Sequence, residues 1–272
     1  MIRFIGAVLY VLVISFVTTS DAVAEKRVAL VIGNSAYQHV PDLPNPKNDA
    51  EQIASMLQSL GFAVHHKRDL SKAGMDRALL EFTNAAAGAD VAAVFFAGHG
   101  LEVNGANYLI PVDSKLRTDR TLTFEAVSLS DVMVALDDVK GVRIVLLDAC
   151  RNNPFIASMK RGTSTRSIGR GLARVEPANG TVISFAAKAG QIAADGKGPN
   201  SPFTAALLQN LSTPGLDIGI LFRKVRDSVY KATNGAQEPF VSASLTGKQT
   251  YLVPPKIIQP GTERAAKDAA KQ

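Results

Sequence analysis

AVFFAGHGL (residues 93–101) and VLLDACRNN (residues 145–153) are two apolar runs that each end in small residues and one reactive side chain. His99 follows the first run, and Cys150, the only cysteine of the chain, follows the second. Continuous aliphatic runs of this length are typical of strands buried on both faces of a sheet. The two stretches therefore predict buried strands that deliver a base and a nucleophile to their carboxyl ends.

Strands and helices are expected to alternate around these two runs. The predicted strands are RVALVIG (27–33), FAVHHKR (62–68), DVAAVFFAGHG (90–100) and VRIVLLDAC (142–150). Helical periodicity separates them, and the first helix is expected to begin at Asn48 or Asp49 and to end at Gly61. Such alternation predicts an α/β fold with a mostly parallel sheet, and ligands bind such sheets outside the carboxyl ends of the strands.

The remaining elements are also predicted from local patterns. Residues 101–110 indicate a hairpin that turns at Asn104 and Gly105. Further helices are expected around residues 72–87, 129–139, 201–211 and 217–233, a strand at TVISFAA (181–187), and short β pieces near Phe240 and Tyr251.

Composition shifts divide the chain into five parts. Arg3, the apolar run at 4–17 and AVA at 22–24 are typical of a secretory signal peptide, so we expect residues 1–24 to be removed, with an uncleaved anchor as the alternative. The other parts are a catalytic part (25–155), a flexible basic linker (156–178), a smaller part (179–253) and a polar tail (254–272). The protein is thus expected to be exported, to the periplasm or beyond a bacterial cell.

The formal net charge of +6 does not indicate a nucleic-acid partner. The basic excess lies between Lys160 and Arg174 without interleaved aromatic residues, which favours a solvated loop. No second hydrophobic span follows the signal segment, so no membrane contact is expected after its cleavage. The oligomeric state stays open.

The lone cysteine and the histidines each have two interpretations. An unpaired cysteine in an oxidising compartment is either buried and inert or chemically active, and His99 alone is more often structural. The spacing of the four histidines and the cysteine predicts no metal site. The GN after the first strand lacks the later glycines of a dinucleotide fingerprint, which argues against a nucleotide binder.

The order strand, GHG, about fifty residues, strand, DAC resembles the caspase-like cysteine peptidases. The resemblance runs from about Arg27 to Leu252 and is greatest to the prokaryotic metacaspase-like branch, the orthocaspases. It implies a three-layer caspase-like sandwich, with large-subunit-like and small-subunit-like parts on either side of the linker. It further implies a Cys150–His99 dyad that needs no cofactor, with the backbone amides of Gly100 and Cys150 as the oxyanion hole.

The resemblance also implies a substrate preference, through two acidic residues of this chain. Asp148 stands where animal caspases have a glutamine that helps to bind acidic side chains, and Asp49 in KNDA matches a metacaspase motif. An anionic pocket attracts Arg or Lys, so protein or peptide substrates with a basic residue before the cleaved bond are expected. For Asp49 alone, an ordinary helix N-cap is an equally good interpretation.

The chain departs from metacaspases at two places. Ala97 replaces the serine that many of them have two residues before the histidine. Their calcium site often has a paired DD, whereas this chain has only the scattered Asp113, Asp119 and Glu125, which leaves calcium dependence open without favouring it.

The basic linker suggests that the protein cleaves itself, and three other functions remain as alternatives. Cleavage after Lys160, Arg161 or Arg166 would fall in the predicted linker, although a linker whose charge only aids solubility explains the same residues. The rivals are a catalytically silent scaffold or peptide-binding relative, a legumain- or gingipain-type peptidase with another preference, and a flavodoxin-like nucleotide binder. The intact His99 and Cys150 favour the peptidase over the silent relative.

Overall fold

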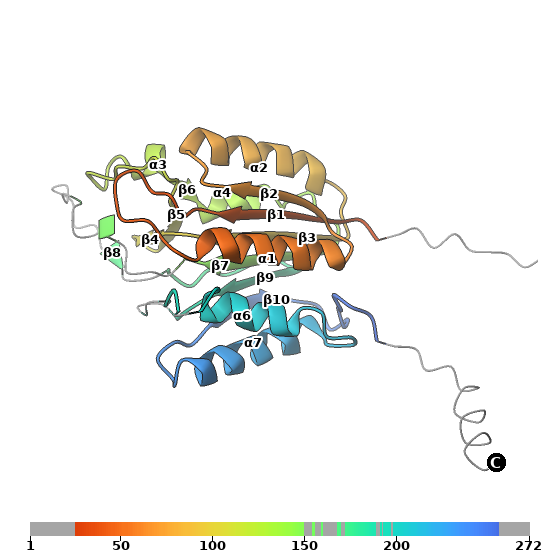
Figure 1. Ribbon diagram of the computed structural model, residues 1–272. Helices are drawn as coiled ribbons and strands as arrows, with labels where there is room; N and C mark the ends of the chain where they lie inside the picture. The colour runs from red at the N-terminus through yellow and green to blue at the C-terminus, as the bar shows by residue number, and fades with distance from the viewer. Residues whose placement is uncertain are drawn as a thin grey trace, which may run out of the picture.

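The central feature of the fold is a six-stranded sheet. The computed structural model describes residues 25–149, 154–155, 159, 168–169, 172–188, 191, 193–196 and 198–255. The sheet has the order β10-β9-β7-β3-β1-β2, and every pair is parallel except β10 with β9. Its strands are β1 (Arg27–Gly33), β2 (Ala63–Arg68), β3 (Val91–Ala97), β7 (Val142–Asp148), β9 (Thr181–Phe185) and β10 (Phe240–Ser244). The predicted α/β class with a mostly parallel sheet is confirmed (Figure 1).

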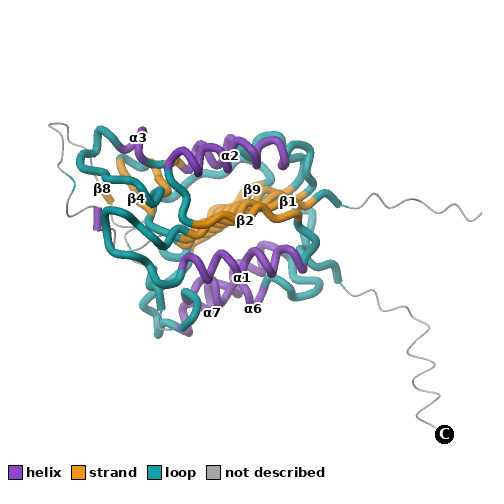
Figure 2. Tube along the Cα trace, turned by 45° about the horizontal axis from the view of Figure 1, so that its top comes forward, coloured by secondary structure: helices purple, strands orange, loops and turns teal. Residues whose placement is uncertain are grey.

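Helices cover both faces of this sheet and form the two outer layers of a three-layer fold (Figure 2). α1 (Pro46–Ser59), α6 (Pro202–Asn210) and α7 (Ile218–Ala232) lie on one face, and α2 (Lys72–Ala86) lies on the other (Figure 2). Each helix turns a buried apolar stripe inward, with Ile53 and Leu57 on α1, Phe82 on α2 and Phe222 on α7. β3 is buried along its whole length between the two layers, which explains its unbroken apolar sequence.

A second, four-stranded antiparallel sheet adjoins the carboxyl end of β3. Its order is β6-β5-β4-β8, formed by β4 (Gly100–Val103), β5 (Ala106–Leu109), β6 (Val127–Ser128) and β8 (Ile168–Gly169). The predicted hairpin is present, and Asn104 and Gly105 at its turn have φ of +54° and +81°. Both φ values are positive, as a two-residue type I′ turn requires. β4 begins one residue after His99, so the hairpin fixes the chain that leaves the predicted base.

The structure corrects several local predictions. α1 begins at Pro46, after Asn45, so neither Asn48 nor Asp49 is its N-cap. Proline is favoured in the first turn because its fixed φ suits a helix and its missing N–H would have no partner there. α4 (Leu129–Val134) is shorter than predicted, and the one-turn α3 (Leu122–Glu125) was not predicted. Elements this short have too few residues to show a periodicity.

The described residues include part of the predicted linker and little of the predicted tail. The signal segment 1–24 and the tail beyond residue 255 lie outside the described residues. Within the predicted linker 156–178, β8 pairs with β4 through Val103 and Ile168, and residues 172–178 are described as an irregular segment. Among the described residues, no helix is long and apolar enough to span a bilayer.

Candidate active site

Strand register places His99 and Ala149, the residue before Cys150, at one edge of the sheet. Ala97, the last residue of β3, pairs with Asp148, the last residue of β7. His99 and Cys150 each follow two residues after this pair, on adjacent parallel strands. Cys150 lies outside the described residues, but Ala149 immediately before it is described and fully buried.

The backbone segments next to these two residues contact each other directly. A Cβ added to Gly100 would lie 2.5 Å from the carbonyl oxygen of Ala149 and 3.1 Å from its Cβ. Cδ2 of Leu172, which belongs to the predicted linker, would also lie 3.1 Å away. Only a glycine allows this approach of two backbones, so Gly100 holds the His99 loop against the residue before Cys150.

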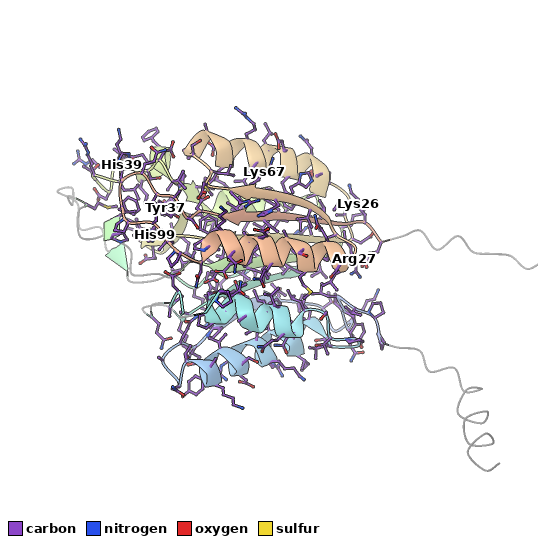
Figure 3. All side chains as sticks on the ribbon, in the orientation of Figure 1. Lys26, Arg27, Tyr37, His39, Lys67 and His99 are labelled. Carbon is purple, nitrogen blue, oxygen red and sulfur yellow. The ribbon has the colours of Figure 1, made fainter. Side chains whose placement is uncertain are left out.

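His99 lies in an aromatic setting at this edge. Its side chain is 2% exposed, and its ring centroid is 4.6 Å from that of Tyr37 and 6.0 Å from that of Phe155. The Phe155 contact is edge-to-face, with an interplanar angle of 88°. Tyr37 comes from the loop after β1, and Figure 3 shows it beside His99 at the same end of the sheet. No sequence pattern singled out Tyr37 as a site residue.

Asp49 and Asp148 meet at a common residue, Ser201. Both carboxylates are fully buried. Asp49 Oδ1 accepts hydrogen bonds from the Ser201 backbone N–H and from Asn200 Nδ2, each at 3.0 Å. Asp148 Oδ2 accepts from the Ser201 hydroxyl and, at 3.0 Å, from Thr204 Oγ1. The structure thus brings together the two acidic residues that the sequence predicted to share a pocket.

Ser201 is also the N-cap of α6. Its Oγ accepts the backbone N–H of Thr204 at 2.9 Å while its hydroxyl donates to Asp148. Ser201 followed by Pro202 is a recognisable helix-start pattern, but its contact with two aspartates more than 50 residues away has no local signal. Ser201 and Thr204 are therefore site residues that sequence reasoning missed.

Two asparagines connect the loop before α6 to the start of α1. Asn45 Nδ2 donates to the carbonyl oxygen of Asp195, and Asn48 Nδ2 donates to that of Pro199. Together with the Asp49 contacts, these bonds hold Asp195 and residues 199–201 against the first turn of α1. The surroundings of Asp49 and Asp148 thus come from elements on both sides of the predicted linker.

The acidic residues considered for calcium do not converge. Asp113 Oδ1 accepts the backbone N–H of Lys72 at 2.9 Å, and Glu125 Oε2 accepts those of Lys115 and Leu116, each at 2.7 Å. Asp119 is buried, 2% exposed. Among the described residues, no three His, Cys, Asp or Glu side chains are grouped to hold a metal ion.

Glu125 has a structural role that should be visible in the pH dependence of stability. Burial raises its pKa, but hydrogen bonds from Thr121, Leu116 and Lys115, with the charge of Lys115, together lower the pKa below its ordinary value of 4.5. A lowered folded-state pKa stabilises the fold above pH 4.5, and this stabilisation disappears as pH falls through the folded pKa.

Glu125→Gln is therefore expected to lower the melting temperature at pH 7, with the difference from wild type shrinking below pH 4.5. Thermal unfolding followed by circular dichroism between pH 3 and 7 measures this. Glu81→Gln, at an exposed residue in a 3.5 Å ion pair with Lys67, is the control and should change little. A pH-independent loss for Glu125→Gln would contradict the role of its charge.

The self-processing candidates Lys160, Arg161 and Arg166 lie outside the described residues. The chain that follows them is held in place. Ala173 exchanges two hydrogen bonds with the Asn107 side chain, of 2.6 and 2.8 Å, and Leu172 is 3% exposed. Arg174 lies over the ring of Phe240, 5.4 Å from its centroid. The segment from residue 172 onward is therefore anchored to both sheets.

Comparisons with known proteins agree with this arrangement. A family model described as "Caspase domain" matches residues 26–250. The chain is 30% identical over 136 residues to human "Mucosa-associated lymphoid tissue lymphoma translocation protein 1", and 30% identical over 135 residues to the mouse homolog. These matches cover 49% of this chain but only 16% of each relative. A solved structure described as "structure of pro-sf-caspase-1" superposes with a TM-score of 0.59, covering 86% of this chain and 92% of that one at 15% identity, which is a likeness of fold.

Proposed function

The chain belongs to the caspase-domain family, and we propose that within it the protein is a cysteine endopeptidase that cleaves after Arg or Lys. One observation carries this proposal. The register of Ala97 with Asp148 sets His99 and Cys150 at equal distances along the chain beyond adjacent strand ends. Asp148 lies at the same edge, and Ser201 joins its buried carboxylate to that of Asp49.

The proposed chemistry is acyl transfer. His99 takes the proton of the Cys150 thiol, and the thiolate attacks the carbonyl carbon of the scissile bond. The backbone amides of Gly100 and Cys150 stabilise the oxyanion, and His99 returns the proton to the leaving amine. Water then hydrolyses the thioester and regenerates the thiol. None of these steps calls for a metal or cofactor.

The preference for a basic side chain rests on charge. Asp49 and Asp148 are both fully buried, and they would line the pocket for this side chain. Buried carboxylates interact with a cation more strongly than they would in water. Their neutral partners Asn200, Ser201 and Thr204 fix the carboxylate oxygens in place. A guanidinium or ammonium group suits this pocket, whereas an aspartate side chain would be repelled.

A panel of fluorogenic peptides with Arg, Lys, Asn or Asp before the cleaved bond tests the proposal. Cleavage after Arg and Lys, absent in Cys150→Ala protein, is expected. Preference for Asn would favour a legumain-type peptidase, and preference for Asp would refute the pocket argument. A folded wild type that cleaves none of the four would favour the silent relative.

Self-processing in the linker is part of the proposal. Cleavage after Lys160, Arg161 or Arg166 would create a new amino end. This end would stay attached to the second sheet, because Ile168–Gly169 pairs with β4 and Ala173 with Asn107. Incubated wild type should yield two fragments that co-elute in gel filtration, with new amino termini between residues 161 and 167. The Cys150→Ala chain should stay whole. New termini in this range in both proteins would point to a contaminating protease.

We also propose that the protein is an exported orthocaspase-like enzyme that acts without calcium. The sequence of residues 1–24 supports export, and the separate contacts of Asp113 and Glu125 support independence from calcium. Amino-terminal sequencing of the protein from its native cells tests the first part. Activity that persists in a calcium chelator tests the second.

A further inference from the structure

The hydroxyl of Tyr37 interrupts the hairpin ladder at His99. β4 and β5 pair antiparallel with Gly100 opposite Leu109, so the next pair along the ladder is His99 with Ile110. The Ile110 N–H donates to the His99 carbonyl oxygen at 3.0 Å, as one half of a hydrogen-bonded pair. The other half would be His99 N–H to the Ile110 carbonyl oxygen. Instead, His99 N–H donates to Tyr37 Oη at 2.8 Å, and Tyr37 Oη donates to that oxygen at 3.1 Å.

These bonds form a closed ring. It runs from the His99 N–H to the Tyr37 hydroxyl and on to the carbonyl oxygen of Ile110. The N–H of Ile110 then leads back to the His99 carbonyl oxygen. The inserted hydroxyl spreads the two strands at the residue that carries the imidazole. Both backbone polar groups of His99 are thereby fixed, one by a side chain from the loop after β1.

Gly98 makes the insertion sterically feasible. A Cβ at Gly98 would lie 2.7 Å from Tyr37 Oη and 2.8 Å from Cζ of Phe96. Any other residue at this position would push the hydroxyl out of the ladder. The glycine before His99 is therefore matched to the tyrosine 61 residues earlier in the chain.

The ring of Tyr37 acts on the same residue as its hydroxyl. Its centroid lies 4.6 Å from that of the imidazole, and Phe155 closes another side of the imidazole edge-to-face. Tyr37 itself is 5% exposed and belongs to a small apolar cluster with Leu101 and Ile110. A buried aromatic side chain that bonds the backbone and contacts the ring of one residue restricts how that residue can move.

We propose that Tyr37 is a positioning residue for His99, which sets the imidazole in the orientation needed to take the proton of Cys150. The inference rests on the proposed function, because it assumes that His99 is the base. Loss of the hydroxyl would let the His99 and Ile110 chains close directly or leave the His99 N–H without its acceptor. Either change moves the imidazole relative to the thiol, and misplacement of about 1 Å costs up to about 100-fold in rate.

Two measurements on Tyr37→Phe test this proposal. The first is kcat and KM on an Arg peptide. The second is the pH dependence of alkylation of the protein by iodoacetamide, which reports the thiolate of Cys150 alone because the chain has one cysteine. Tyr108→Phe is the matched control, because Tyr108 lies on the same hairpin and its hydroxyl has no hydrogen bond within the described part of the chain. His99→Ala supplies the reference curve for a cysteine without its base.

Tyr37→Phe is expected to lower kcat by about 10- to 100-fold with little change in KM. Its alkylation curve should move from that of wild type toward that of His99→Ala, and Tyr108→Phe should match wild type in both measurements. Thermal unfolding identifies a temperature at which all variants are folded for these assays.

Three results would overturn the proposal. Wild-type kcat and alkylation in Tyr37→Phe would show that the hydroxyl does not position His99. A fall in kcat with an unmoved alkylation curve would place the effect of Tyr37 elsewhere. An alkylation curve of His99→Ala identical to wild type would show that His99 does not activate Cys150, and the proposed dyad would fail together with this inference.

Discussion

Cys150→Ala and His99→Ala are each expected to lower kcat/KM on an Arg peptide by about 10,000-fold or more, since a nucleophile and its base act as one unit. The structure supports this pairing through the register of Ala97 with Asp148 and the contact of Gly100 with Ala149. Initial rates on the fluorogenic Arg peptide, with active protein titrated by alkylation of Cys150, measure the effect for His99→Ala. For Cys150→Ala the protein concentration comes from absorbance.

The double variant separates a dyad from two independent contributions. If the residues act together, Cys150→Ala/His99→Ala loses little more than either single variant. His39→Ala is the control, because His39 is an exposed histidine of the loop after β1 and should leave the rate unchanged. Substantial turnover by folded Cys150→Ala protein would end the cysteine mechanism.

Asp148→Asn is expected to lower kcat/KM for Arg substrates by about 10- to 100-fold, because a charge-assisted hydrogen bond to the substrate becomes a neutral one. The substitution keeps an oxygen that can accept from Ser201 and Thr204, so the melting temperature should change far less than the activity. Comparing an Arg peptide with its citrulline counterpart isolates charge, since citrulline has nearly the same shape and is neutral. Wild type should prefer Arg strongly, and Asp148→Asn should lose most of that preference.

Asp138→Asn makes the same change of charge at an exposed residue before the amino end of β7, opposite the site. It should keep the preference of wild type for Arg over citrulline. Equal cleavage of both peptides by wild type would show that the pocket does not recognise charge.

The sequence predicted those parts of the molecule that have a strong local pattern. β3 and β7 are buried on both faces, so their apolar runs were unambiguous, and each run located a reactive residue at its end. The hairpin was predicted because Asn and Gly readily adopt the positive φ that its turn needs, and Asn104 and Gly105 have it. α3 and β8 span four and two residues, too few for a pattern, and both depend on tertiary contacts.

The candidate site was predicted less completely for a related reason. Asp49 and Asp148 could be named from the sequence, but Ser201, which joins them, is 152 residues from Asp49. Tyr37 reaches His99 across 62 residues through a loop with no regular structure. Such contacts are set by how loops pack on strand ends, and no periodicity or spacing encodes them.

Ser201 couples the stability of the protein to the substrate preference that we propose. Because the same hydroxyl caps α6 and holds Asp148, a change at this position that reshapes the pocket would also remove a helix cap, which costs about 1 kcal/mol. Thr204 contacts the same carboxylate oxygen from within the helix, and the cap uses its backbone N–H and not its hydroxyl. Engineering or evolution of a new specificity therefore has a less costly path through residue 204 than through residue 201.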